Sequence, residues 1–110
     1  MRSKEKALGE MVGRLRKEWR TPHPVRVALT TGLPPQVKGT CTRNGRTLHI
    51  HLNSRFPLYV LQEVLLHEWA HAITWPHARL ERHQPMHPDE WALAYGRLYR
   101  WWYDEEEEEK

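Results

Sequence analysis

Three segments of the chain repeat their apolar residues with the period of an α-helix. Residues 4–20 carry the first stripe, which consists of Leu8, Met11, Val12, Leu15 and Trp19. Residues 57–75 carry the second, in which Glu68 lies among Leu61, Val64, Leu65 and Ala72, and residues 88–103 carry the third, with Trp91, Ala94, Tyr95, Leu98 and Trp102. Pro57 and Pro88 suit a first helical turn, whereas Pro22 and Pro76 cannot continue a helix. The sequence therefore predicts three helices, each with one face in a core.

Two further regions have the pattern of β-strands. Residues 25–30 alternate apolar and polar side chains, as a half-buried strand does. Asn44-Gly45 separates two more runs and favours a two-residue type I′ turn, because both turn positions need a positive φ. Pairing outward from this turn places on one apolar face the pairs Cys41 with Leu48, Gly39 with Ile50 and Val37 with Leu52. His49 and His51 fall on the other face, where we expect them to meet solvent.

Together these elements predict a compact α+β domain, in which a small three-stranded sheet with an antiparallel pair packs on three helices. A chain of 110 residues fits one such domain. We assign residues 1–103 to it and expect residues 104–110, with six acids and one base, to form a disordered tail. No apolar run approaches the roughly 20 residues of a membrane span, and no signal-peptide core is present. We therefore expect a cytoplasmic protein without membrane contact.

The net charge of +3 is unevenly distributed, because the acidic segment 104–110 offsets a basic body formed by residues 1–103. Residues 1–103 hold sixteen Lys and Arg against eight Asp and Glu, a surplus that suits a polyanion such as nucleic acid or an acidic protein partner. Tryptophans could stack on single-stranded nucleic acid, although at helical spacing they are more often core residues. DNA is therefore a candidate partner of the basic body.

The stretch VLLHEWAHAI, residues 64–73, suggests a metal site within the second helix. His67 and His71 are four residues apart, so both imidazoles leave the same helix face at a separation suited to one Zn²⁺. Glu68 lies one position round the helix, where its carboxylate can hold a metal-bound water and take its proton. Cys41 is the only cysteine, which excludes a disulfide within the chain and a cysteine-based zinc ribbon. The ligands are therefore expected to be histidines and carboxylates.

A catalytic zinc usually has three protein ligands, and the candidates for the third are His77, His83, His87 and Glu90. His77 has the spacing of the pattern H-E-x-x-H-x-x-G-x-x-H, but Thr74 stands where that pattern has its glycine. His87 directly precedes Pro88, so the start of a rigid helix can aim its ring at the motif helix. Glu90 follows one turn later, as a ligand, an outer partner or a surface acid. Placement favours His87, with His77 and Glu90 as alternatives.

The basic first helix, VRVALT, LHIHLNSRF, VLLHEWAHAI and HPDEW, in this order and spacing, resemble the SprT-like zinc metalloprotease domain, the family that includes SprT and Spartan. The resemblance covers roughly residues 5–103 and implies a minimal zincin-like domain that lacks the C-terminal zinc ribbon. It implies that His67, His71 and His87 bind Zn²⁺, that Glu68 is the general base, and that Glu90 and Trp91 match the acid and aromatic residue behind the third ligand.

The resemblance also implies the function. We expect a zinc-dependent metallopeptidase that hydrolyses peptide bonds in proteins by Glu68-assisted attack of a zinc-bound water, with proteins associated with DNA as a candidate substrate class. The alternative is a catalytically silent module, in which a structural metal supports binding to nucleic acid or to an acidic partner. A purely structural site would use four protein ligands and would not need Glu68.

Overall fold

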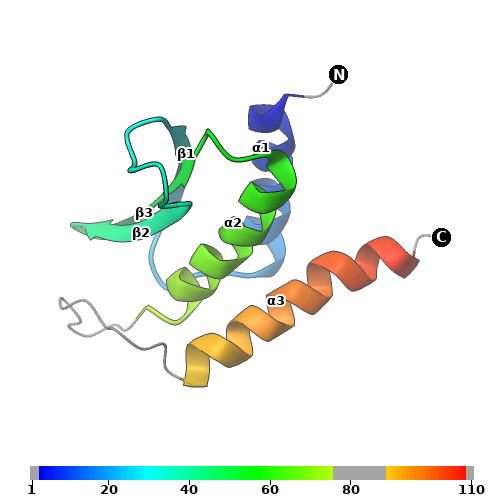
Figure 1. Cartoon of the computed structure of the whole chain (residues 1–110). Coiled ribbons are helices and arrows are strands. Elements are labelled where there is room, and N and C mark those ends of the chain that lie inside the picture. The colour runs from blue at the N-terminus through cyan, green and yellow to red at the C-terminus, as the bar shows by residue number, and fades with distance from the viewer. Residues whose placement is uncertain (1–2, 76–88, 109–110) are drawn as a thin grey trace.

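The computed structural model of the protein describes residues 3–75 and 89–108, and the surroundings of their side chains as far as Asp104. The elements follow in the order α1 (Lys4–Glu18), β1 (Val25–Thr30), β2 (Gly39–Asn44), β3 (Thr47–Asn53), α2 (Leu58–Ile73) and α3 (Asp89–Glu108). The α+β class, with a three-stranded sheet and three helices, is confirmed (Figure 1). No helix within the described ranges combines the length and the apolarity that crossing a membrane requires.

Helix α1 forms as its periodicity predicts. The Ser3 hydroxyl caps its first turn by accepting a hydrogen bond from the backbone N–H of Lys6 at 3.1 Å. The Lys4 ammonium donates to the carbonyl oxygens of Ser54 at 2.6 Å and Phe56 at 3.1 Å. The start of α1 is thereby fixed to the connection between β3 and α2, while the apolar stripe of α1 enters the core.

Strand β3 is the centre of the sheet, whose order is β1-β3-β2. It pairs in parallel with β1 and antiparallel with β2, so the sheet is mixed. Leu48, Ile50 and Leu52 of β3 are completely buried in the core that the sheet shares with α1 and α2. This burial explains the alternation of apolar residues in LHIHL.

The predicted register of the β2–β3 hairpin is wrong by two residues. Asn44 pairs with Thr47 and Cys41 with Ile50, so the turn consists of Gly45 and Arg46. Gly45 has a φ of 65°, and no other residue of the described chain has a positive φ. One positive φ at the first turn position is the pattern of a type II′ turn, which needs glycine there and not at the second position. A shift of two keeps every side chain on its predicted face.

Helix α2 lies between the sheet and α3, and contacts both (Figure 1). Its buried face carries most of the apolar residues of the motif helix, namely Leu61, Leu65, Leu66, Trp69, Ala70 and Ala72. At Gly39 of β2, a Cβ atom would lie 2.6 Å from Val64 Cγ1. Glycine at this position therefore allows β2 to approach α2 closely.

The loop before β2 is held by a buried side chain, Asn53. Its Nδ2 donates to the carbonyl oxygens of Val37 at 2.9 Å and Pro34 at 3.2 Å, and its Oδ1 accepts from the backbone N–H of Arg55 at 3.1 Å. A buried amide with three hydrogen bonds stabilises the loop that it organises. This loop leads directly into the part of β2 that borders α2.

Helix α3 passes Tyr103, where the sequence predicts its end, and continues to Glu108. Leu98 is completely buried, and the other four members of the predicted stripe pack partly buried against the core. The Arg14 guanidinium lies 5.0 Å from the ring centroid of Trp101 and of Trp102, which joins α1 to α3 by cation–π contacts. The helix thus includes acidic residues of the segment 104–110, and the domain boundary at residue 103 stays a prediction.

Candidate metal centre

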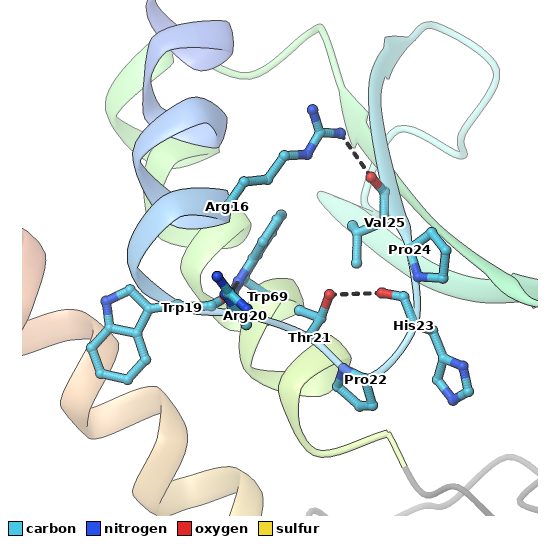
Figure 2. Close-up of a pocket in the computed structure, with 9 residues that line it drawn as sticks. All are labelled: Arg16, Trp19, Arg20, Thr21, Pro22, His23, Pro24, Val25 and Trp69. Carbon is cyan, nitrogen blue, oxygen red and sulfur yellow. Dashed lines mark hydrogen bonds between the residues drawn. The ribbon is translucent and has the colours of Figure 1, made fainter.

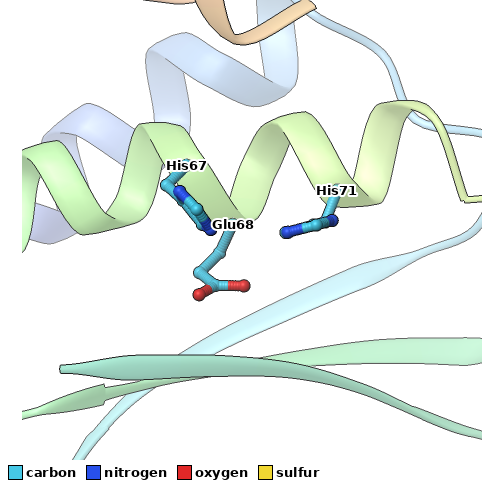
Figure 3. Close-up of side chains that lie close together, drawn as sticks. All are labelled: His67, Glu68 and His71. Carbon is cyan, nitrogen blue, oxygen red and sulfur yellow. The ribbon is translucent and has the colours of Figure 1, made fainter. Parts of the chain in front are cut away.

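Helix α2 brings together the three side chains of the motif. The rings of His67 and His71 have centroids 5.0 Å apart. One potential ligand atom from each of His67, Glu68 and His71 lies within 4.8 Å of the other two (Figure 3). Figure 3 shows all three side chains extending from α2 on the side of the β-strands. The grouping that the i, i+4 spacing predicts is therefore present.

The carboxyl group of Glu68 lies in an unusual environment for an acid. Its residue is only 7% exposed, although His67 and His71 on either side of it are half-buried. Burial disfavours the charged form and raises the pKa of Glu68 from 4.5 to about 7. Without a cation nearby, this side chain can hold its proton close to neutral pH.

Strand β2 contributes a second titratable group beneath the motif. Burial, and after it the charge on Glu68, raise the pKa of the Cys41 thiol to about 12. Cys41 is therefore a neutral thiol that faces α2, and its side chain is not in the group of close ligand atoms. Its position follows from the apolar face of the hairpin, because residues 39 and 41 point the same way as Ile50 and Leu52.

Two aromatic residues of α3 pack against the histidines. The Trp91 ring lies 4.8 Å from the His67 ring and 5.3 Å from the His71 ring, between centroids. Trp91 Nε1 also donates a hydrogen bond to the backbone carbonyl of His67 at 3.2 Å. Tyr95 stacks on Trp91 at 5.2 Å and lies 5.8 Å from the His67 ring. Aromatic side chains of helix α3 thus pack against both imidazoles.

The donor set fits a transition metal, and Zn²⁺ in particular. Two imidazole nitrogens and a carboxylate oxygen are ligand types that zinc accepts, and their mutual distances allow one ion to contact them all or to contact one through a water. Among the residues that the structure describes, these three form the group that could hold a metal ion.

The other candidate ligands are placed differently. His77, His83 and His87 lie outside the described residues, so their selection stays a prediction. Glu90 is exposed in the first turn of α3 and does not belong to the group of close ligand atoms. Its place near the N-terminal end of α3 fits a surface acid that interacts favourably with the helix dipole.

A cleft of about 380 Å³ opens beside the motif, and we call it the metal-side cleft. It is lined by Gln36, Lys38, Gly39, Val60, Glu63, Val64, His67, Glu68 and Tyr95. The Tyr103 hydroxyl donates to Oε2 of Glu63 at 3.2 Å. Burial, and then the charge on Glu63, raise the pKa of Tyr103 to about 12 and raise that of Tyr95 as well. The cleft thus has the motif at its wall and a carboxylate one helical turn away.

A larger hollow of about 570 Å³ lies on another side of α2, and we call it the basic groove (Figure 2). Arg16, Arg20 and His23 line it together with Trp19, Trp69 and the loop to Val25, and none of its described lining residues is acidic. The Arg16 guanidinium donates to the carbonyl oxygen of Val25 at 2.7 Å. Trp69 is buried and donates to the carbonyl oxygen of Trp19 at 2.9 Å, so it is a core residue here. The basic groove is larger than the metal-side cleft, but His67 and Glu68 of the candidate metal group line the smaller one.

Several residues of the centre were not assigned a role there from the sequence. The sequence predicts no role for Glu63 or Lys38 there, and it predicts Tyr95 as a member of the buried stripe of the last helix. The spacing of Glu63 four residues before His67 is the signal that places it on the same face of α2. No comparable signal exists for Lys38, because its position depends on the loop that Asn53 organises.

Comparison of the chain with models of known protein families, with curated proteins and with solved structures finds no match in any of the three.

Proposed function

We propose that the protein is a zinc-dependent metallopeptidase of the SprT-like kind, which hydrolyses peptide bonds in proteins. The observation that carries the proposal is the group of His67, Glu68 and His71, of which His67 and Glu68 line an open cleft. A site that only stabilises the fold would be closed by protein ligands, whereas a site beside a cleft leaves room for a substrate.

The roles within the group follow from the chemistry of the side chains. His67 and His71 would hold Zn²⁺, and His87 is the third ligand that we propose from the sequence. Bound zinc supplies Lewis acidity, which lowers the pKa of water and polarises a carbonyl group. Trp91 would orient the two imidazole rings, because it donates a hydrogen bond to the backbone carbonyl of His67 and packs against the rings of His67 and His71.

Glu68 is the general base of the proposal. Its carboxylate oxygen accepts a proton from the attacking water and returns that proton to the nitrogen of the leaving amine. Burial raises the pKa of Glu68 to about 7 in the metal-free protein. A Zn²⁺ ion held by His67 and His71 would lower this pKa and favour the carboxylate form that a general base needs.

The neighbourhood of the cleft favours a peptide as the substrate. Strand β2 is an edge strand of the sheet, and Gly39 of this strand lines the cleft. The outer side of an edge strand offers backbone N–H and C=O groups that an extended peptide can pair with. A protein chain in extended conformation could therefore bind along β2 and pass the motif.

Metal analysis combined with a proteolysis assay tests the proposal. The purified protein should contain one zinc ion, cleave an unfolded protein such as casein, lose the activity to a chelator and regain it with added Zn²⁺. His67→Ala and His71→Ala should each lose both zinc and activity, whereas His49→Ala, on the other face of the sheet, should keep both. Bound zinc without cleavage would instead support the silent binding module.

We further propose that the basic groove binds single-stranded DNA by contacts to phosphates. Two arginines, a histidine and no described acid at the groove support this partner. Arg20→Glu should weaken binding of a labelled oligonucleotide. It should also reduce the slope of the logarithm of the binding constant against the logarithm of the salt concentration by about one, the value for one lost phosphate contact. Arg55→Glu, beyond the end of β3 that lies opposite to the Val25 pairing, is the control, and equal losses in both variants would contradict a specific role of the groove.

A further inference from the structure

The metal-side cleft has a charged end that the hydrolytic chemistry does not use. Glu63 lines the cleft four residues before His67, so its carboxylate lies about one helical turn from the metal-binding group on the same face of α2. Glu63 is exposed, but a hydrogen bond restricts its carboxylate, because the Tyr103 hydroxyl donates to its Oε2 at 3.2 Å. Glu63 is thus a positioned negative charge inside the cleft.

Aromatic rings of α3 surround this carboxylate. Tyr95 lines the cleft beside Glu63, and its ring centroid lies 6.0 Å from that of Tyr99. Tyr99 in turn lies 4.6 Å from Tyr103, whose hydroxyl reaches Glu63. A carboxylate next to phenol rings is a combination that attracts an ammonium or guanidinium group through charge and through cation–π contact.

No cation of the described chain occupies this position. Lys38 is the cationic residue among the described residues that line the cleft, and its ammonium lies 5.9 Å from the centroid of the Phe56 ring. Within the described residues, the polar partner of Glu63 is the Tyr103 hydroxyl, and no ion pair joins Glu63 to Lys38. The carboxylate is therefore available to a cation from outside.

We propose that Glu63 and Tyr95 form a specificity subsite that receives an arginine or lysine side chain of the protein substrate. The inference rests on the proposed peptidase function and adds to it the class of sequence that is cleaved. Tyr103 is a positioning residue, since it acts on the substrate only by holding the carboxylate of Glu63. The subsite selects a cationic residue close to the scissile bond, because one helical turn separates it from His67.

Matched peptides that differ only in charge test the subsite. A neutral eight-residue peptide is prepared with arginine, or with its uncharged isostere citrulline, at each position in turn. The zinc-loaded wild-type protein should cleave the arginine peptide with a kcat/KM about five- to tenfold higher at one position, the size expected of an exposed ion pair with a cation–π contact. Glu63→Gln should bring the two rates together by lowering kcat/KM for the arginine peptide to that for the citrulline peptide.

Further variants separate a specific subsite from a general charge effect. Tyr103→Phe should lower the arginine preference in part, with unchanged zinc content. Asp104→Asn also removes one negative charge, at the position after Tyr103 on α3, and this variant should keep the full preference for arginine. Equal rates for arginine and citrulline at every position, or a preference that survives in Glu63→Gln, would overturn the inference.

A binding measurement distinguishes this failure from failure of the peptidase function. Zinc-loaded Glu68→Gln protein should bind the fluorescent arginine peptide about five- to tenfold more tightly than the citrulline peptide, and the added Glu63→Gln substitution should abolish the difference. Absence of cleavage with this difference present would contradict the proposed function alone. Equal affinities of Glu68→Gln protein for the two peptides would contradict the subsite.

Discussion

The burial of Glu68 makes the stability of the metal-free protein depend on pH. In the unfolded chain this carboxyl group has a pKa of 4.5, and in the folded protein its pKa is about 7. The folded state therefore binds the proton more tightly, and the unfolded state holds fewer protons between these values. The stabilising contribution is fully present below pH 4.5 and is lost as the pH rises toward and through about 7.

The magnitude follows from the two pKa values. Each tenfold difference in proton affinity corresponds to about 1.4 kcal/mol, so the full effect approaches about 3 kcal/mol. Between pH 5 and pH 8 the contribution of Glu68 to the free energy of unfolding should fall by about 2.5 kcal/mol. Glu68→Gln removes the titration but keeps the shape of the side chain, so the variant should gain this amount over the wild type across the same interval.

Urea unfolding followed by tryptophan fluorescence, with a chelator present, measures the effect. The difference in unfolding free energy between Glu68→Gln and wild type is determined at pH 5 and at pH 8, which removes contributions that both proteins share. Gln62→Ala, at a position of the same helix that does not titrate, is the control and should differ from the wild type by the same amount at both pH values. The same difference at both pH values for Glu68→Gln would refute the argument from burial.

Three further substitutions, two of them paired with a control variant, test the packing around the centre and along α3. Gly39→Ala should destabilise the fold by about 1–3 kcal/mol in urea unfolding, because the added methyl group would meet a side chain of α2 at 2.6 Å, whereas Gly13→Ala, which meets nothing within 4 Å, should stabilise it by about 0.5–1 kcal/mol. Leu98→Ala should lower the melting temperature and cost about 2–5 kcal/mol, while Leu93→Ala at an exposed position should cost under about 0.5 kcal/mol; similar losses would show that α3 is not anchored through Leu98. Trp91→Phe should weaken zinc binding about tenfold in competition with a chelator, and unchanged affinity would mean that its hydrogen bond to His67 does not support the site.

The hairpin shows how far the sequence predicts the fold. The alternation of apolar residues places Cys41 and Gly39 correctly on the helix side, because a register error of two residues does not change the face. The turn itself was predicted wrongly, because Gly45 suits both the second position of a type I′ turn after Asn44 and the first position of a type II′ turn before Arg46. Tertiary contacts therefore decided between local preferences that the sequence leaves close together.

The candidate site also has one part that the sequence predicts and one part that it does not. The spacing of His67 and His71 on a helix is a local property, so it predicts their grouping with Glu68. The pKa of Glu68 is raised by burial, and β2, which Gly39 allows to approach α2 closely, is distant from Glu68 in the chain. Such long-range contacts leave no periodic signal, which is why the metal-side cleft could not be derived from the sequence.

The rate of peptide hydrolysis by zinc-loaded Glu68→Gln protein, compared with that of the wild type at equal zinc content, tests the central claim most directly. If Glu68 is the general base of a metallopeptidase, kcat should fall by at least about a hundredfold while zinc stays bound. Equal kcat values for the two proteins would contradict the assignment of α2 as the catalytic helix.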